Sequence, residues 1–301
     1  MTDEVEYKEI NYMDFKEQLI DYSNLINTEL ENYLAVSEVP ERKLLEAMRY
    51  SLEAGGKRIR PALILESYRL FADDYKEALS FAMAMEMVHT FSLIHDDLPA
   101  IDNDDYRRGK LTNHKVFGED TAILAGDGLL NLAYETISKT IDNEKKVNAF
   151  KEFSMAVGNM IKGEFVDVDC EGRNIDYDTL LYMHHNKTGA LISGSIKIGA
   201  ILAGADEVSL KRLEHYADNI GITFQIKDDL LSLNGDFKKL GKPIGNDVLN
   251  EKCTFVTLLG EAEANKILEE LTEDAVKIAS EFGDKGEFLK NLAIFIKDRE
   301  Y

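Results

Sequence analysis

The chain has 301 residues, of which 45% are hydrophobic, enough to bury a sizeable core. Its 56 acidic residues outnumber 35 lysines and arginines, and the resulting formal charge of −21 opposes binding to nucleic acid and to anionic membrane surfaces. The two cysteines, Cys170 and Cys253, indicate neither a disulfide framework nor a thiolate metal site, and they agree with a cytoplasmic location. Because the overall field repels anions, an anionic substrate would need a local cluster of bases or metal ions.

Few prolines, and apolar residues that recur at spacings of three and four, predict an almost entirely helical protein. The acidic N-terminus, and Lys197 within the most apolar later stretch, predict neither a signal peptide nor a membrane span. No low-complexity linker divides the chain, so we expect a single domain over residues 1–301. In chain order, helices are expected near residues 13–36, 40–54, 60–72, 74–97, 119–141, 145–169, 177–204, 206–232, 250–259, 262–282 and 284–299.

The segment "SLIHDDLPAID" places acidic residues at the end of a long apolar helix. Helical spacing puts Asp96 on the same face as His89, with Asp97 at the border of that face. Pro99 interrupts the helical hydrogen bonds, so the chain can fold back and bring Asp102 near the same place.

The segment "FQIKDDLLSLNGD" repeats this arrangement near the last third of the chain. Gln225, Asp228 and Asp229 share a helical face, and Ser232 completes it. Each acidic pair could simply be a solvated helix end, but both follow strongly apolar helices that should line the interior. Crowded carboxylates there need cations, and ligands that are all oxygen suit Mg²⁺.

Basic residues lie beside glycine breaks or acidic pairs in "GGKRIRP", "YRRGK", "NKTGA", "LGKPIGND" and "NEKCT". A lone lysine is more often a surface lysine, but a set placed this way indicates a binding site. Arginine, lysine and Mg²⁺ together suit a diphosphate. The basic residues concerned are Lys57, Arg60, Arg107, Arg108, Lys187, Lys242 and Lys252.

With these motifs in this order, the chain closely resembles the trans-prenyltransferases, the polyprenyl synthetase family that includes farnesyl and geranylgeranyl diphosphate synthases. The resemblance runs from "GGKRIRP" to the C-terminus. It implies an all-α fold, a single large bundle of antiparallel helices around a central cavity, usually in a homodimer. It also implies head-to-tail condensation of isopentenyl diphosphate with an allylic diphosphate, dimethylallyl or geranyl, through ionisation, condensation and loss of a proton.

The same resemblance assigns roles to the motif residues, with three Mg²⁺ ions per active site. The expected Mg²⁺ ligands are Asp96, Asp97, Asp102, Asp228 and Asp229. The allylic diphosphate would be held by Arg107, Lys187, Thr188, Gln225, Lys242 and Lys252, of which Arg107, Lys187 and Lys252 act in catalysis with Asp96 and Asp97. Isopentenyl diphosphate would be held by Lys57, Arg60, His89 and Arg108. Asp167, in "GEFVD", matches a further acid of the cavity.

The chain departs from the family pattern at two positions. Ser232 stands where the second motif usually ends in aspartate, which should weaken its hold on an outer Mg²⁺. Glu164 stands where glutamine is usual and adds a negative charge.

Product length is expected to depend on residues just before the first motif. Inside the first motif itself, Pro99 and Ala100 match the two extra residues of the bacterial type, which places the chain with short-product enzymes. Phe91 lies about 7.5 Å below Asp96 along the helix axis and, with Ser92, would form the floor for the growing tail, although a buried aromatic can equally be core packing. We therefore expect a farnesyl product, with geranylgeranyl as the alternative.

Other classes fit less well. A helical metal-dependent phosphohydrolase would need its histidines to converge, the candidates being His89, His114, His184 and His185. A weakly active partner subunit is suggested by Ser232 alone, and a terpene cyclase would not need the isopentenyl-binding bases.

Overall fold

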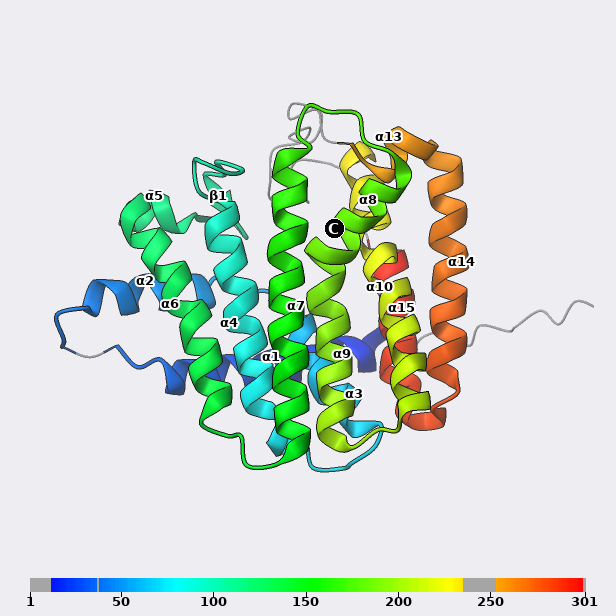
Figure 1. The fold of residues 1–301 in the computed structure, drawn as a ribbon, viewed down its shortest axis with the longest axis horizontal. Helices are drawn as coiled ribbons and strands as arrows, with labels where there is room; N and C mark the ends of the chain where they lie inside the picture. The colour runs from blue at the N-terminus through cyan, green and yellow to red at the C-terminus, as the bar shows by residue number, and fades with distance from the viewer. Residues whose placement is uncertain (1–11, 37, 235–252, 300–301) are drawn as a thin grey trace, which may run out of the picture.

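The computed structural model describes residues 12–36, 38–234 and 253–299, and the described part is helical apart from one short hairpin (Figure 1). Lys242 and Lys252 lie outside the described residues. The α-helices are α1 (Tyr12–Tyr33), α2 (Arg42–Leu52), α3 (Ile59–Arg69), α4 (Leu79–Asp96), α5 (Asn113–Phe117), α6 (Glu119–Ser138), α7 (Glu144–Asp169), α8 (Tyr177–His184), α9 (Ala190–Ala203), α10 (Glu207–Asn234), α13 (Phe255–Leu259), α14 (Glu261–Ser280) and α15 (Glu287–Asp298). Two 3₁₀ turns, η1 (Tyr75–Ala78) and η3 (Gly283–Gly286), one π-helical turn, η2 (His185–Gly189), and the strands β1 (Tyr106–Arg107) and β2 (Lys110–Leu111) complete the list.

The predicted all-α fold is confirmed, and the expected helices occur within a few residues of their predicted bounds wherever the structure describes them. The helix expected over 177–204 is divided by the π turn η2. The hairpin and α5 were not expected. In the hairpin, the antiparallel strands pair Tyr106 with Leu111. Arg108 and Gly109 join them, and both have positive φ, as a type I′ two-residue hairpin turn requires.

The long helices lie side by side, while α1, α2 and α3 pass behind them (Figure 1). Helix α4 packs on α6, α9 packs on both α3 and α7, and α10 packs on α14. The C-terminal ends of α4, α7 and α10 gather at one end of this bundle (Figure 1). Both acidic motifs therefore reach the same end of the molecule.

Two groups of buried apolar residues hold this arrangement. The larger joins α1, α2, α3, α4, α6, α7, α9, α10, α14 and α15, and includes Leu63, Phe81 and Phe153, which are fully buried. The smaller joins α8, α10, α13 and α14 around Ile226 and Phe255. This second group supports the end of α10 that carries the aspartates.

Candidate active site

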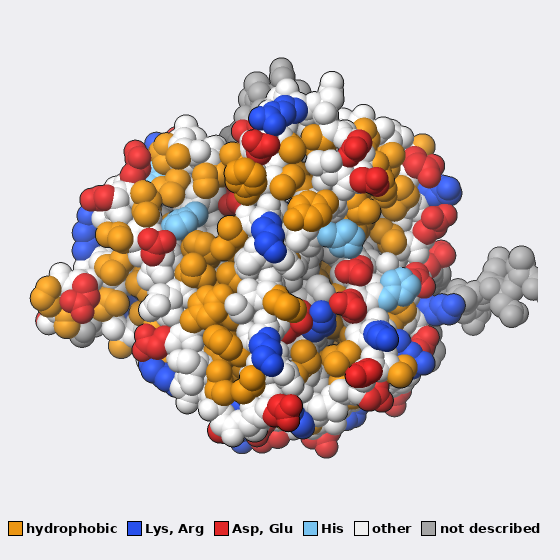
Figure 2. Space-filling view, viewed as in Figure 1, with side chains coloured by type: hydrophobic (Ala, Val, Ile, Leu, Met, Phe, Trp, Pro, Cys, Tyr) orange, Lys and Arg blue, Asp and Glu red, His pale blue; other side chains and the backbone are white. Residues whose placement is uncertain are grey.

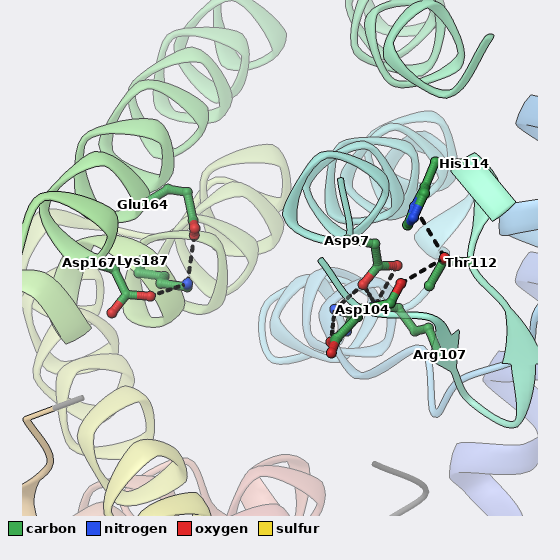
Figure 3. Close-up of polar contacts among 8 residues, drawn as sticks. All are labelled: Asp97, Asp104, Arg107, Thr112, His114, Glu164, Asp167 and Lys187. Atoms are coloured by element: carbon green, nitrogen blue, oxygen red, sulfur yellow. Dashed lines mark hydrogen bonds and ion pairs between the residues drawn. The ribbon is translucent and has the colours of Figure 1, made fainter. Parts of the chain in front are cut away.

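The first acidic motif folds back at the end of α4. The backbone N–H of Asp102 donates to the Asp96 carbonyl at 2.9 Å, which confirms the predicted return of the chain after Pro99. Asp97 is buried and accepts from Arg107 of β1, with Nε 2.7 and 2.8 Å from its two oxygens and Nη2 2.6 Å from Oδ1 (Figure 3). The hairpin, which was not predicted, directs Arg107 back toward α4. It therefore positions a residue that the sequence had singled out.

A second group forms around Lys187 in the π turn η2. Its ammonium lies 2.5 Å from Asp167 Oδ2 and 2.8 Å from Glu164 Oε2, both on α7 (Figure 3). Gly163 makes this contact possible, since a Cβ there would lie 2.1 Å from the Lys187 backbone nitrogen. Burial raises the pKa of Glu164 to about 7, and nearby Asp96 adds to that shift.

Asp96 links these two groups. Burial raises its pKa, Lys187 and then Arg107 lower it, and Asp102 and Asp97 raise it again. Asp96 therefore lies within electrostatic reach of both bases, which face each other across the end of the bundle in Figure 3. The site has the excess of negative charge that the sequence suggested, with two cations placed against it.

The two aspartates of the second motif have different surroundings. Asp228 is half-buried and pairs with Arg299 at 2.6 Å; this arginine also donates to the Phe224 carbonyl and lies on its ring. Asp229 is buried and accepts from Gln225 Nε2 at 3.0 Å and from the Phe255 backbone N–H at 2.8 Å. Asp229 thus supports the start of α13.

The predicted supports and the chain-length residues are also placed. Thr188 donates to Gln225 at 3.3 Å, which ties η2 to α10. Phe91 is buried with its ring centroid 4.9 Å from that of His95, and Ser92 donates to the His89 carbonyl of its own helix. Ser232 is half-buried on α10.

The bases predicted to hold isopentenyl diphosphate form a third group. Arg60 Nη1 lies 3.3 Å from His89 Nε2, and Arg108 donates to the Gly55 carbonyl. Burial and then Arg60 hold the pKa of His89 well below its ordinary value, so this imidazole is neutral at pH 7. Burial also lowers the pKa of Lys57, whose ammonium lies 5.2 Å from the Phe295 ring centroid.

Asp228 and Arg299 both influence the pKa of Lys57, so this third group lies near the second acidic motif. Sequence reasoning missed Arg299 and the buried Arg58. Arg299 carried no signal, because its contacts with Phe224 and Asp228 join positions about seventy residues apart. Arg58, inside "GGKRIRP", stood in a motif already singled out.

The histidines do not converge on one metal. His114 contacts Thr112, His184 stacks on Phe255, and His185 faces Asp218. These three histidines lie on α5, α8 and η2, whereas His89, which contacts Arg60, lies on α4. Over residues 12–36, 38–234 and 253–299, no three His, Cys, Asp or Glu side chains are grouped closely enough to hold a metal ion by themselves. The phosphohydrolase alternative therefore loses the convergence that it required.

Comparison with known proteins agrees with this helical site. Residues 41–288 match the polyprenyl synthetase family model. A farnesyl diphosphate synthase of Geobacillus stearothermophilus is 45% identical over 81% of this chain and 84% of its own. A chloroplastic geranylgeranyl pyrophosphate synthase of Catharanthus roseus is 42% identical over 95% of this chain and 82% of its own.

Solved structures show the same fold. An FPP/GFPP synthase from Zymomonas mobilis superposes with a TM-score of 0.85 at 34% identity, covering 95% of this chain and 99% of that one. A geranyltranstransferase from Thermotoga maritima gives 0.79 at 34% identity, covering 93% and 99%.

The fold is thus that of the isoprenoid synthases, and the chain belongs to the polyprenyl synthetase family. It is a trans-prenyltransferase of the short-chain type. Within the described residues, no helix has the length and apolar character needed to cross a membrane.

Proposed function

We propose that the protein condenses isopentenyl diphosphate with dimethylallyl or geranyl diphosphate and releases farnesyl diphosphate. One observation carries this proposal: two cations, Arg107 and Lys187, are held against carboxylates at the end of the bundle where the apolar helix α4 ends. Such a site can bind the diphosphate of an allylic substrate through cations while the hydrocarbon tail follows α4 into the core. The names of the relatives support the substrate class.

The carboxylates fit Mg²⁺ as the cation between protein and substrate. Their donors are all oxygen, and burial raises the pKa of Asp96, which indicates a carboxylate that would gain from a further cation. Mg²⁺ is usually held by one or two carboxylates together with substrate phosphates, so a set of three protein ligands is not required. Asp96, Asp97, Asp102 and Asp228 would hold Mg²⁺, which would neutralise charge on the departing diphosphate.

The protein's own residues would divide the remaining work. Lys187 and Arg107 would stabilise the negative charge that develops on the allylic diphosphate as its bond to carbon breaks. Lys57, Arg60 and Arg108 would hold isopentenyl diphosphate so that its double bond attacks the allylic cation. Apolar walls would keep water from that cation until a proton is lost and the new double bond forms.

The direct test is to incubate the purified protein with Mg²⁺, isopentenyl diphosphate and each allylic diphosphate in turn, and to measure products by mass. We expect farnesyl diphosphate as the end product. Geranylgeranyl diphosphate would correct the product length alone. Hydrolysis without condensation, or no turnover with any primer, would contradict the proposed function.

We propose further that two copies associate through α6 and α7. Large apolar side chains are exposed there, including Leu124 at 58% and Phe165 at 68%, and Figure 2 shows hydrophobic side chains gathered on the face that these helices present. Exposed apolar area of this extent usually marks an interface. Light scattering should give twice the chain mass, and Phe165→Glu should shift it to one chain; a monomeric wild-type protein would contradict the proposal.

A further inference from the structure

Arg58 lies between two bases proposed to hold isopentenyl diphosphate, yet its own side chain is buried, with 1% exposed. Each of the three nitrogens of its guanidinium donates a hydrogen bond inside the protein. Nε donates to Asn27 at 2.9 Å, Nη1 to Glu86 at 2.5 Å, and Nη2 to the Leu52 carbonyl. Arg58 therefore cannot contact a substrate itself.

The backbone of Arg58 takes an unusual conformation, with φ at +49° immediately before α3 begins. A residue with a side chain adopts this left-handed region only at a cost, so surrounding contacts must hold it there. The three hydrogen bonds from the guanidinium supply that hold. They turn Arg58 inward, while the neighbouring Lys57 is partly desolvated but still open to solvent.

Glu86 connects this segment to α4. It is buried, with 2% of its side chain exposed, and lies one turn before His89 on the same helix. Arg58 pairs with Glu86, and Arg60 contacts His89. Two successive turns of α4, at Glu86 and His89, thus fix Arg58 and Arg60 of the basic segment.

We propose that Arg58 and Glu86 are positioning residues that set Lys57 and Arg60 for isopentenyl diphosphate. This inference rests on the proposed function. A buried ion pair loses its compensation when one partner becomes neutral, so the segment should relax from its strained conformation. Displacing binding groups by about 1 Å can cost up to a hundredfold.

The first experiment compares steady-state kinetics of the wild-type protein, Glu86→Gln and a control, Arg42→Ala. Glu86→Gln keeps the shape of the side chain and removes its charge. Arg42 is an exposed arginine that pairs with Glu38 and Glu46, as the buried Arg58 pairs with Glu86, so it matches Arg58 in chemistry but not in burial. We expect Glu86→Gln to raise the KM for isopentenyl diphosphate about tenfold or more, with the KM for the allylic substrate changing less than about threefold. The control should leave both values unchanged.

The second experiment uses chemical rescue of Arg58→Ala. A cavity of about 370 Å³, lined by Asn27, Leu30, Leu52 and Arg58, lies beside the guanidinium, so added guanidinium has a route to the vacated position. Millimolar guanidinium should restore the KM for isopentenyl diphosphate, and methylammonium should not. If Arg58→Ala does not fold, Glu86→Gln decides the question.

Two results would overturn the inference. One is an unchanged KM for isopentenyl diphosphate in a folded Glu86→Gln protein, and the other is an equal rise in both KM values, which a general loss of structure would produce. A wild-type protein without condensation activity would instead remove the proposed function, and this inference with it. Because the wild type is measured first, the two failures are distinguishable.

Discussion

Lys187 is surrounded by more carboxylate charge than it can neutralise, since Asp167, Glu164 and Asp96 all act on it. Such a lysine remains protonated and is available to a diphosphate. Lys187→Ala and Arg107→Ala should each lower kcat on the order of a hundred- to a thousandfold, because each removes a positioned cationic donor. Single-turnover measurements would check this.

In Lys187→Ala the remaining carboxylates repel one another, and the double variant Lys187→Ala/Glu164→Gln controls for this repulsion. It restores the net charge of the wild-type cluster without restoring the cation, so it should recover thermal stability but not turnover. Near wild-type turnover in either single variant would contradict the assigned roles.

Phe91 allows a test of product length at a single side chain. Its ring is buried beside His95, so this contact fits the core-packing role as well as the proposed floor. If Phe91 forms the floor, Phe91→Ala opens space for further condensation and should shift products toward geranylgeranyl diphosphate. Product mass would report it. An unchanged product profile in a folded variant would assign Phe91 to packing alone.

His184 makes stability depend on pH. It is buried and stacked on Phe255, and among the described residues neither ring nitrogen has a hydrogen-bond partner. Burial lowers its pKa from 6.5 to about 4, so the unfolded chain binds a proton more readily than the folded protein. This contribution to stability is complete above about pH 6.5 and is lost as the pH falls toward 4.

The melting temperature of His184→Phe should therefore fall less than that of the wild type as the pH is lowered from neutral to mildly acidic values. His215→Phe, at a largely exposed histidine beside Asp274, serves as the control and should behave as the wild type does. Parallel melting curves for all three proteins at every pH would contradict the role of His184.

At the scale of elements, the contact between α7 and η2 depends on Gly163. An alanine Cβ there would meet the backbone of Asn186 and Lys187 at 2.6 and 2.1 Å, and backbone cannot move aside as a flexible side chain can. Gly163→Ala should displace Lys187, lower kcat at least about tenfold and reduce stability.

Gly158→Ala is the matched control, because it lies on the same helix and nothing lies within 4 Å of an added Cβ. It should stabilise the protein by up to about 1 kcal/mol through helix propensity. Thermal unfolding and single-turnover rates would separate the two. A Gly163→Ala protein as active and stable as Gly158→Ala would show that the close approach is unimportant.

The helices could be predicted from sequence because apolar spacing extends over many residues in each. Strands β1 and β2 have two residues apiece, too few to show a period, and their turn begins with Arg108 rather than the usual asparagine or glycine. The π turn η2 spans five residues between two helices, too few to show a period of its own.

The motif residues that gather at this end of the bundle could be chosen from the sequence, but not which of them pair. Asp229 and Phe255 lie far apart in sequence, as do Asp228 and Arg299, so these contacts depend on where α13 and α15 pack. The spacing of residues within one helix contains no information about contacts between residues that are distant in the sequence.

At the scale of the whole molecule, a charge of −21 surrounds a site built to bind anions. Distant charges are screened beyond about 30 Å at 0.01 M salt and about 10 Å at 0.1 M, whereas contacts within the site are screened less. Moderate salt should therefore raise kcat/KM for isopentenyl diphosphate at constant free Mg²⁺. A steady fall from the lowest salt upward would show that the local bases govern approach.

The hydrogen bonds of Asp229 affect what a retained aspartate at this position indicates about related proteins of the same fold. Both of its oxygens accept from the protein, one from Gln225 and one from the Phe255 backbone, and asparagine could replace only one of these acceptors. Selection for a folded chain alone would keep an aspartate at this position after turnover had been abandoned. The fate of Asp228 across descendants is therefore the better record of whether the chemistry was inherited.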